Sequence, residues 1–357
     1  MRAAFRVDAS ASIGSGHVMR CLALAEELRR RNVSSTFLCR AFPGHAGDAI
    51  LRQGFDLRLL PLGTHAASPP PPHAPWLGTS PEEDAAACTA QMPGKTHWLI
   101  VDHYALDARW ESAMRPLSSI QLAIDDLADR PHSCDFLLDQ NLSPQLETRY
   151  AGLLPATCTQ LLGPSFALLH PSFAEACPRT TERTSVQRLL LFFGGGDTDN
   201  LTCRALRELA AVSIPADVVI GSANPHRPEV EALCKNSNGR RLLHVQTTRM
   251  PELMLQADLA LGAGGCSHWE RCLLGLPALV VTTAENQVTA TRMVAEQGAC
   301  RILGDVQSLP DGCFLQGAED LFQNPQALQA MSRAAKALMP DGNGAERVVS
   351  SILESTS

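Results

Sequence analysis

The stretch RVDASASIGSGHVMRCLALA, residues 6–25, decides the fold of this chain. It starts at the end of an apolar run, Ala3–Val7, that predicts a strand. A glycine-containing turn follows, and apolar residues from Val18 to Leu28 then recur with the period of a helix whose last turn carries Arg29–Arg31. A strand that passes through a turn into a helix is the first part of a β-α-β unit, so we expect a parallel sheet.

Short apolar runs alternate with helical patterns along the rest of the chain, and this alternation occurs twice. The runs that predict strands are Ala3–Val7, Thr36–Cys39, Trp98–Val101, Ile120–Ile124 and Phe136–Leu138 in the first half, and Leu189–Phe193, Asp217–Ile220, Leu242–Val245, Leu259–Leu261 and Ala278–Thr282 in the second. They are nearly continuous in Val, Ile and Leu, which is typical of strands covered by helices on both faces. The predicted fold class is α/β, with two doubly wound, Rossmann-like domains.

A polar segment without periodicity, residues 174–187, predicts the boundary between these domains. We expect one domain over residues 1–174 and the other over residues 188–357, with a last helix at Arg347–Leu353. The segment Thr64–Pro81 contains the run Pro69–Pro72, which fits neither a helix interior nor a central strand. It is predicted to be an insertion loop with polyproline character, and a recognition motif for a partner is the alternative.

The composition excludes several classes of protein. The chain has 357 residues, of which 45% are hydrophobic and 19% charged, as in ordinary globular proteins. Its net charge of -7 argues against a general nucleic-acid binder, which needs a basic face. No stretch approaches the roughly 18 apolar residues of a membrane span, and the start at Ala3–Val7 is unlike a signal peptide. Twelve cysteines without a Cys-x-x-Cys pair argue against zinc and for reduced thiols, so we expect a cytoplasmic protein.

The turn after the first predicted strand carries the first candidate site. Gly14 and Gly16 allow a tight turn and a close approach of the backbone to a ligand. His17 falls in the first turn of the predicted helix, where the positive helix end favours the neutral imidazole that a general base needs. We expect His17 to be a catalytic base, and a histidine that only caps or packs is the alternative. The spacing is not Gly-x-Gly-x-x-Gly, so no dinucleotide site is predicted.

A second glycine-rich turn, Gly262–Glu270, lies between the predicted strand Leu259–Leu261 and another helical pattern. Backbone N–H groups at such a turn bind phosphate oxygens, and a serine adds a hydroxyl donor. A carboxylate one turn further on can accept hydrogen bonds from ribose hydroxyls. A close-packed turn without a ligand is the alternative. The residues predicted to bind substrate here are Gly264, Gly265, Cys266, Ser267 and Glu270.

A third turn, Gly194–Asn200, also contains three glycines in succession. It indicates another close approach of the backbone, and Gly195 and Asn200 are predicted to bind substrate. Asp197 and Asp199 have the spacing of a metal-binding pair. Asp199 is better explained as a helix cap, so no metal is predicted.

Polar residues also follow other predicted strands. Asn286 and Gln287 come shortly after a strand of the second half, at the carboxyl end of the sheet where ligands bind in such folds. In the first half, Asp102, Tyr104 and the pair Asp125–Asp126 come at the ends of two strands. Asp102 and Tyr104 are predicted to bind substrate. The carboxylates also suit acid–base chemistry, and solvated or loop-capping side chains are the alternative.

Several motifs taken together resemble one family. They are, in chain order, RVDASASIGSGHVMRCLALA (6–25), VDHYALD (101–107), IDDLADRPH (124–132), DQN (139–141), FFGGGDTDN (192–200), GAGGCSHWERCLLGLP (262–277), ENQ (285–287) and DGNGAERV (341–348). The family is that of the UDP-2,4-diacetamido-2,4,6-trideoxy-β-L-altropyranose hydrolases of pseudaminic acid biosynthesis, which resemble GT-B glycosyltransferases. The motifs span nearly the whole chain, and the first and sixth are long and specific.

The resemblance implies a GT-B-like fold, in which two Rossmann-like domains face a central cleft and the second binds most of the UDP. It implies that His17 is the catalytic base. The substrate contacts that it implies are the Gly264–Ser267 turn, Glu270 and Asn286. His170 stands where the family has an arginine that contacts substrate, so this contact is expected to differ. The proline-rich insertion is longer than a minimal member of the family needs.

The implied reaction is hydrolysis without a metal or cofactor. Water, deprotonated by His17, attacks the anomeric carbon of the UDP-sugar with inversion and releases UDP. Because the family acts in pseudaminic acid biosynthesis, the resemblance also implies a role in flagellin glycosylation. Two alternatives remain: a GT-B glycosyltransferase with a sugar or lipid acceptor, and a non-catalytic protein that binds the nucleotide sugar. No nucleic-acid partner is expected.

Overall fold

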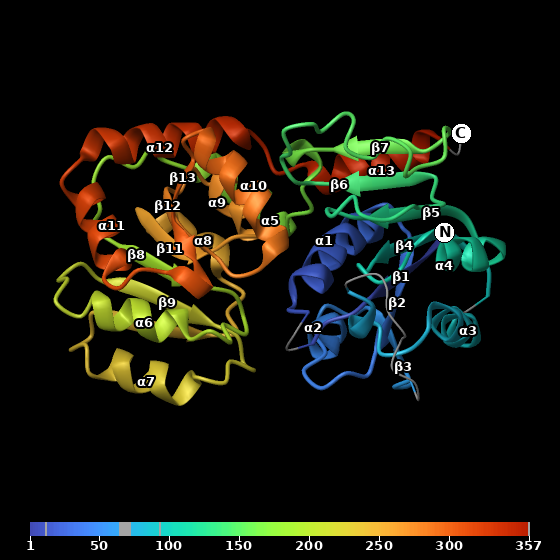
Figure 1. Ribbon diagram of the computed structural model, residues 1–357, viewed down its shortest axis with the longest axis horizontal. Coiled ribbons are helices and arrows are strands. Elements are labelled where there is room, and N and C mark those ends of the chain that lie inside the picture. The colour runs from blue at the N-terminus through green and yellow to red at the C-terminus, as the bar shows by residue number, and fades with distance from the viewer. Residues whose placement is uncertain (11–12, 64–72, 93, 356–357) are drawn as a thin grey trace. The chain divides into compact units, whose positions relative to one another are not determined.

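The computed structural model of the chain describes residues 1–10, 13–63, 73–92 and 94–355. The chain forms two compact units (Figure 1): Met1–His170 together with Asn343–Ser357, and Pro171–Gly342. Each unit contains one parallel sheet with helices packed on it, so the predicted α/β class with two doubly wound domains is confirmed.

The first unit is built, in its described residues, on a seven-stranded sheet with the order β3-β2-β1-β4-β5-β6-β7. The strands are β1 (Arg2–Val7), β2 (Ser34–Arg40), β3 (Asp56–Leu60), β4 (Thr96–Asp102), β5 (Ser118–Ile124), β6 (Phe136–Asp139) and β7 (Thr159–Leu162). Every neighbouring pair is parallel. The central strands β1, β4 and β5 are almost entirely buried, in keeping with their continuous apolar runs.

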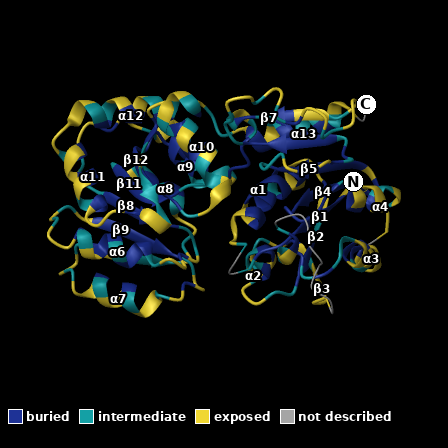
Figure 2. Ribbon diagram, in the orientation of Figure 1, coloured by how far each residue is buried: buried dark blue, intermediate teal, exposed yellow. Residues whose placement is uncertain are grey.

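Helices cover both faces of this sheet. They are α1 (Gly16–Arg30), α2 (Gly47–Arg52), α3 (Pro81–Gln91), α4 (Ala108–Met114) and α13 (Gly344–Glu354). Leu22 of α1 and Val348 of α13 belong to the core on one face, and Cys88 of α3 and Trp110 of α4 belong to the core on the other. Figure 2 shows the result: the central strands are buried along most of their length, while the helices alternate between buried and exposed faces.

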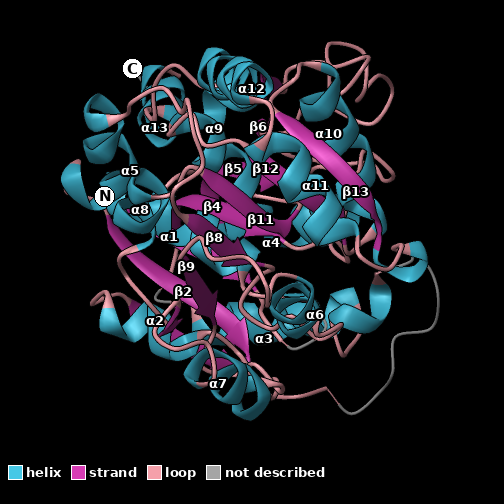
Figure 3. Ribbon diagram, turned by 90° about the vertical axis from the view of Figure 1, so that its left-hand side faces the viewer, coloured by secondary structure: helices cyan, strands magenta, loops and turns pink. Residues whose placement is uncertain are grey.

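The second unit repeats this architecture with six parallel strands among its described residues, in the order β10-β9-β8-β11-β12-β13. The strands are β8 (Leu189–Phe192), β9 (Ala216–Ile220), β10 (Arg241–Val245), β11 (Leu259–Ala263), β12 (Ala278–Thr282) and β13 (Cys300–Asp305). The helices are α5 (Pro171–Ala176), α6 (Leu201–Glu208), α7 (Arg227–Lys235), α8 (Met250–Gln256), α9 (Ser267–Leu273), α10 (Glu285–Glu296), α11 (Cys313–Phe322) and α12 (Pro325–Leu338). Figure 3 shows the helices in cyan around the strands in magenta.

The division of the chain differs from the predicted one at both boundaries. The predicted second domain, residues 188–357, included the last helix, but α13 belongs to the first unit. Val348 and Ile352 are buried in the same core as α1 and β1, so the apolar face of α13 determines where it packs. The other boundary lies between His170 and Pro171, ahead of the predicted polar segment, because α5 already packs against α8 and α9 of the second unit.

Three strands, β3, β7 and β13, have no predicted counterpart. All three lie at the edge of a sheet. Their side chains are largely exposed or only partly buried, so they lack the continuous apolar run that indicates a central strand. Every strand that the sequence predicted, apart from β10, therefore has a neighbouring strand on both sides.

Each sheet has one point at which the chain reverses its direction of growth. In the first unit the chain adds β2 and β3 on one side of β1 and then returns to place β4 on the other side. In the second unit it adds β9 and β10 beside β8 and returns to place β11. The turns that leave the two central strands diverge at such a switch point, and ligands of α/β proteins bind there.

Two further expectations concern membrane spans and the proline-rich insertion. No helix among the described residues is long and apolar enough to cross a membrane. Residues 64–72, which make up half of the proline-rich insertion, lie outside the described residues. The rest of the insertion contains a short 3₁₀ helix, η1 (Ala74–Trp76), and ends where α3 begins.

Candidate functional site

His17 and Asp102 meet at the switch point of the first sheet. β1 ends at Val7, and α1 begins at Gly16, so His17 lies in the first turn of that helix. Asp102 is the last residue of β4. Nδ1 of His17 lies 2.6 Å from Oδ1 of Asp102, and both side chains are buried. Two residues 85 positions apart in the sequence thus form one polar pair.

This pair fixes the tautomer of the neutral imidazole. A carboxylate can only accept a hydrogen bond, so Nδ1 of His17 carries the ring proton and donates it to Asp102. Nε2 then holds the lone pair. Nε2 has no hydrogen-bond partner among the residues that the structure describes. An imidazole that is held by a carboxylate and has a free basic nitrogen is the arrangement of a general base.

Arg20, one turn further along α1, holds Asp102 in place. Its Nε and Nη2 donate to the two carboxylate oxygens at 2.6 and 2.7 Å, which is a bidentate contact. Burial alone would raise the pKa of Asp102, but the charge of Arg20 and the contact with His17 hold that pKa well below its usual range. Asp102 is therefore ionised at every ordinary pH. Sequence reasoning missed Arg20, although its spacing of three residues from His17 puts both on one helix face.

Tyr104 and Asp126 extend this network along the carboxyl edge of the sheet. The Tyr104 hydroxyl donates to Asp126, and Nη1 of Arg20 reaches the same carboxylate at 3.1 Å. Nδ2 of Asn141, which follows β6, also donates to Asp126, at 3.2 Å. The Tyr104 ring stands edge-on to the His17 ring, with the ring centroids 4.7 Å apart. The ends of β4, β5 and β6 therefore all contribute to the surroundings of His17.

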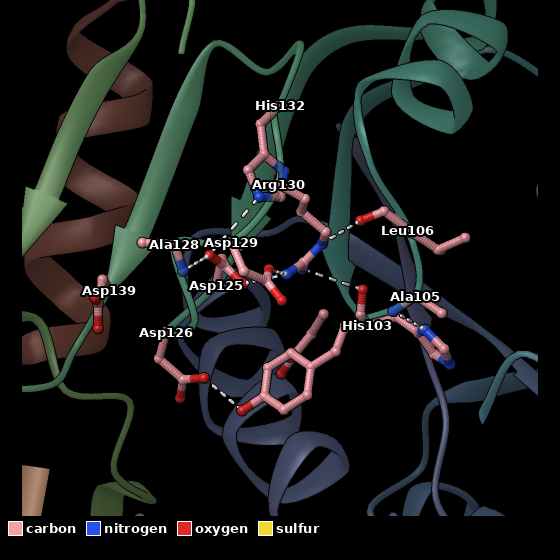
Figure 4. A network of polar contacts seen from close by, with 12 residues as sticks. His103, Ala105, Leu106, Asp125, Asp126, Ala128, Asp129, Arg130, His132 and Asp139 are labelled. Atoms are coloured by element: carbon pink, nitrogen blue, oxygen red, sulfur yellow. Dashed lines mark hydrogen bonds and ion pairs between the residues drawn. The ribbon is translucent and has the colours of Figure 1, made fainter. Parts of the chain in front are cut away.

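A second buried cluster supports the loops that carry these residues (Figure 4). Nη1 of Arg130 lies 2.8 Å from Asp125, and its Nε donates to a backbone carbonyl in the loop after β4, also at 2.8 Å. Burial would lower the pKa of His132, but Asp125 and Glu111 raise it to about 9. Asp125 also accepts a backbone N–H of its own loop. Asp125 thus caps its own loop, whereas Asp126 belongs to the network around His17.

The two predicted glycines of this turn differ in whether the structure requires glycine at their positions. Gly14 has a φ of +79°, which side chains rarely adopt. Gly16 has no positive φ, and a Cβ added there would meet no described atom within 4 Å. Neither conformation nor packing in the described residues requires glycine at this position. The open space beside Gly16 is consistent with a ligand that approaches the backbone next to His17.

The switch point of the second sheet is built from glycine turns. β11 ends at Ala263, and Gly265 has a φ of +87° directly before α9 begins at Ser267. The predicted residues Gly264, Gly265, Cys266 and Ser267 are all partly exposed. Gln287 of α10 lies against this turn, because a Cβ on Gly264 would lie 3.0 Å from its Oε1. The structure thus brings Gln287 together with the turn, and no local pattern in the sequence indicates this contact.

Arg271 is buried behind this turn without a carboxylate partner within ion-pair distance among the described residues. Its Nη2 donates to the Ala263 carbonyl at 3.0 Å and lies 3.2 Å from Nδ1 of His268. Burial and the charge of Arg271 hold the pKa of His268 well below its usual range, so Nε2 carries the proton and donates to Thr291 at 2.9 Å. An un-neutralised positive charge therefore lies behind the glycines, which favours an anion in front of them.

Glu270 lies one residue before Arg271 and is partly exposed. Burial raises the pKa of its carboxyl to about 7. The carboxyl has no hydrogen-bond partner among the described residues, in contrast to Asp102. A carboxylate that lacks donors in the protein can accept hydrogen bonds from a ligand, and paired ribose hydroxyls match its two oxygens.

The turn after β8 corrects one prediction. Asp197, and not Asp199, caps α6: its carboxylate accepts the backbone N–H groups of Leu201 and Thr202 at 2.9 and 2.8 Å. Asp197 and Asn200 both have positive φ values, and this tight turn directs the first of the two acidic side chains to the helix end. The prediction that Asp199 caps the helix is therefore wrong.

The predicted substrate contacts of the same turn have partners within the protein. The carbonyl of Gly195 accepts the N–H of Gly221 at 3.0 Å, which ties the turn to the end of β9. Nδ2 of Asn200 donates to Glu229 of α7 at 3.0 Å. Asn200 thus has a structural contact in this conformation, and a substrate contact of either residue stays a prediction.

Two predicted residues lie apart from these clusters. Asn286 is exposed in the first turn of α10, next to Gln287. His170 is exposed and is the last residue of the first unit before the chain enters the second. Their contacts with substrate stay predictions. No group of three or more His, Cys, Asp and Glu side chains in the described part of the chain is placed to hold a metal ion.

No family model matches this chain. It is 31% identical over 193 residues to the spore coat polysaccharide biosynthesis protein SpsG of Bacillus subtilis (strain 168), and the match covers 52% of this chain and 56% of that relative. It is 24% identical over 298 residues to the UDP-2,4-diacetamido-2,4,6-trideoxy-beta-L-altropyranose hydrolase of Campylobacter jejuni, and this match covers 84% of the chain and 97% of the relative.

The crystal structure of MurG from Acinetobacter baumannii aligns with 99% of this chain and 99% of its own length, with a TM-score of 0.63 and 15% sequence identity. At this identity the similarity establishes the fold. The predicted GT-B-like pair of Rossmann-like domains is confirmed, and a protein of the family that the motifs resemble is among the relatives. The chain therefore has the GT-B fold and is related, over 84% of its length, to a UDP-2,4-diacetamido-2,4,6-trideoxy-beta-L-altropyranose hydrolase.

Proposed function

We propose that this protein is a UDP-sugar hydrolase that releases UDP from UDP-2,4-diacetamido-2,4,6-trideoxy-β-L-altropyranose in pseudaminic acid biosynthesis. The observation that carries the proposal is the pair of His17 and Asp102, in which the carboxylate holds the imidazole and leaves Nε2 free. A protein that only bound the nucleotide sugar would not need a base of this kind. The relative with the same activity in its name supports the choice of substrate.

The proposed reaction is a direct displacement by water. Nε2 of His17 takes a proton from water while the water oxygen forms a bond to the anomeric carbon. The bond from that carbon to the diphosphate oxygen breaks, and its electron pair leaves with UDP. Attack opposite to the leaving group inverts the configuration of this carbon. Asp102 stabilises the imidazolium that forms, because its carboxylate already accepts the Nδ1 proton.

The second unit supplies the binding of the leaving group. UDP is a good leaving group, so its departure needs stabilisation of negative charge more than protonation. The backbone N–H groups of the Gly264–Ser267 turn are the proposed donors to the diphosphate, and the buried charge of Arg271 acts from behind them. Glu270 accepts the ribose hydroxyls in this proposal, and Asn286 and Gln287 lie at the neighbouring helix start.

The test is an incubation of the purified protein with the UDP-sugar alone, followed by nuclear magnetic resonance of the free sugar and of UDP. We expect UDP and a free sugar of inverted anomeric configuration to be released at equal rates without any acceptor. Release that depends on an added sugar or lipid acceptor would identify a GT-B glycosyltransferase instead. Binding without any release would identify a protein that only holds the nucleotide sugar.

A further inference from the structure

Three aromatic rings lie next to one another beside His17. Two of them have no role in the proposed mechanism. The ring of Trp76 lies at 29° to the ring of Tyr104, with the centroids 5.8 Å apart. The ring of His73 lies 4.7 Å from that of Trp76 and 5.2 Å from that of Tyr104. Since Tyr104 stands against His17, this aromatic wall of His73, Trp76 and Tyr104 ends at the proposed base.

The proline-rich insertion supplies two of the three rings. His73 directly precedes the 3₁₀ helix η1, and Trp76 is the last residue of that helix. Leu77, the next residue, is 1% exposed and belongs to the core between the sheet and α3 and α4. Ala74 is also buried. These two anchors fix η1 on the first unit, so the positions of His73 and Trp76 next to Tyr104 are set by packing.

Trp76 differs from the other tryptophans of the chain, all of which lie in its described part. Trp98, Trp110 and Trp269 are 2%, 1% and 0% exposed, whereas Trp76 is only partly buried. Burial of an indole is strongly favourable, because it has the largest apolar area of any side chain. An indole that an anchored helix keeps accessible beside the proposed base therefore indicates a surface for a ligand.

The two partly exposed rings of the wall, His73 and Trp76, are uncharged, whereas Tyr104 is 2% exposed and the Arg130 guanidinium lies 5.9 Å from its ring centroid. Burial lowers the pKa of His73, so its ring is neutral near pH 7. The charged groups nearest to this ring, Asp129 and Arg130, form an ion pair with each other at 2.9 Å. A ligand that packs on this surface therefore meets the faces of neutral rings, which favour apolar C–H groups.

We propose that His73 and Trp76 form the binding surface for the sugar ring and determine specificity for a deoxy, N-acylated sugar over a fully hydroxylated one. This inference rests on the proposed function, since it assigns the sugar subsite of that reaction. The C6 methyl and the acetamido methyl groups of such a sugar are apolar and pack well on aromatic faces. A hydroxyl group in the same place would lose its contacts with water without gaining a partner.

The first test compares two substitutions of Trp76 in steady-state hydrolysis. Trp76→Phe keeps an aromatic face, and Trp76→Leu keeps apolar bulk without one. For the UDP-diacetamido-trideoxy sugar we expect Trp76→Leu to raise KM about tenfold and Trp76→Phe to change it by less than about threefold. Inhibition by UDP, which lacks the sugar, is expected to stay within about twofold of the original protein. Pro75→Ala, an exposed change in the same short helix, is the control and should alter neither value.

A merely structural role for Trp76 predicts a different pattern. In that case Trp76→Leu would lower the melting temperature and the amount of active enzyme, while KM and the preference over UDP-glucose stayed the same. The proposal is overturned if the ratio of kcat/KM for the two UDP-sugars is unchanged in Trp76→Leu. It is supported if that ratio falls by about tenfold, as expected from the loss of one aromatic contact.

A second measurement does not depend on turnover. Because the three other tryptophans are buried, acrylamide quenches the fluorescence of Trp76 in preference to theirs. Protection of this fluorescence by the UDP-sugar, but not by UDP, supports the sugar subsite even if the protein fails to hydrolyse the compound. Unchanged quenching at saturating UDP-sugar rejects the subsite. Turnover with unchanged quenching would leave the proposed function standing and remove only this inference.

Discussion

The two sheets of this protein have the same kind of switch point but different chemistry at it. In the first unit the start of α1 and the ends of β4 and β5 bring together four ionisable side chains, His17, Arg20, Asp102 and Asp126. In the second unit the turns after β8 and β11 contain the glycines Gly194–Gly196 and Gly264–Gly265, the Asp197 carboxylate of the first turn caps α6, and Arg271 is buried behind the second turn. In the proposed function, one topology thus provides a place for proton transfer in one unit and a place for an anion in the other.

The difference between the charged side chains of the first switch point and the glycine turns of the second follows from the two proposed tasks, proton transfer and anion binding. A base must have a defined tautomer, which needs a charged partner, and a buried charged partner needs a counter-charge of its own. This explains the chain of contacts from His17 through Asp102 to Arg20. A diphosphate brings its own charge, so backbone N–H groups suffice and side chains would only obstruct its approach. The comparison yields three experiments, from the largest expected effect to the smallest.

Replacement of the proposed base should have the largest effect. His17→Ala removes Nε2 and is expected to lower kcat by about 10²- to 10⁴-fold, because this is the usual contribution of a general base. The affinity for UDP, measured by calorimetry, should be unchanged, since UDP binding is assigned to the second unit. His97→Ala, at an exposed histidine at the opposite end of β4, is the matched control. Near-normal turnover by His17→Ala would contradict the proposed function of the first switch point.

Replacement of its carboxylate partner should have an intermediate effect. In Asp102→Asn the new amide donates to Nδ1, so the proton moves to Nε2 and the base is lost in the resting state. We expect kcat to fall by about 10²-fold with little change in KM. The melting temperature should also fall, because Arg20 loses part of its counter-charge.

A control separates stability from catalysis in that experiment. Asp84 is also buried and also binds two arginines, Arg6 and Arg40, but it does not contact His17. Asp84→Asn should lower the melting temperature in the same way while kcat per folded molecule stays near normal. Equal losses of kcat in both variants would show that Asp102 acts only through stability.

The smallest effect concerns Glu270 and depends on pH. The pKa of this carboxyl is about 7 in the folded protein, against a usual value of 4.5, so the folded protein favours its neutral form. Its contribution to stability is therefore fully present below pH 4.5 and is lost as the pH rises through 7. Glu270→Gln should raise the free energy of unfolding at pH 8.5, by at most about 3 kcal/mol, and leave it unchanged near pH 4.

Binding should depend on Glu270 with the opposite sign. The ionised carboxylate is the better acceptor for ribose hydroxyls, so the affinity for uridine should increase by about tenfold as the pH rises from 6 to 8. Uridine is chosen because it carries no titrating phosphate. Glu270→Gln should abolish this dependence. A pH dependence that persists in the variant would assign the titration to another group and separate Glu270 from the ribose.

The accuracy of the strand predictions follows the position of each strand. The central strands β1, β4, β8 and β11 are buried on both faces, so each contains a run of mostly apolar residues that predicts a strand. The edge strands β3, β7 and β13 contain charged or polar residues that face solvent, and nothing local distinguishes them from loops. Their identity depends on the strand that each one pairs with.

For the site, residue types were easier to predict than partnerships. The glycine turns and His17 stand out in the sequence, because few other reasons place glycines and a histidine between a strand and a helix. The contact between His17 and Asp102 has no local signal, since it requires β1 and β4 to be neighbours. Trp76 and His73 had no assigned role for the same reason: only the packing of η1 places them against Tyr104.

The sequence by itself determined the α/β class, the two repeats of the β-α-β pattern and the turns that carry the candidate chemistry, because these depend on patterns within some twenty neighbouring residues. Only the tertiary structure decided which strands are neighbours, which unit the last helix joins and which charged side chains form ion pairs. Those features depend on contacts between distant parts of the chain, where the free energy of burial and ion pairing, and not local propensity, selects the partner.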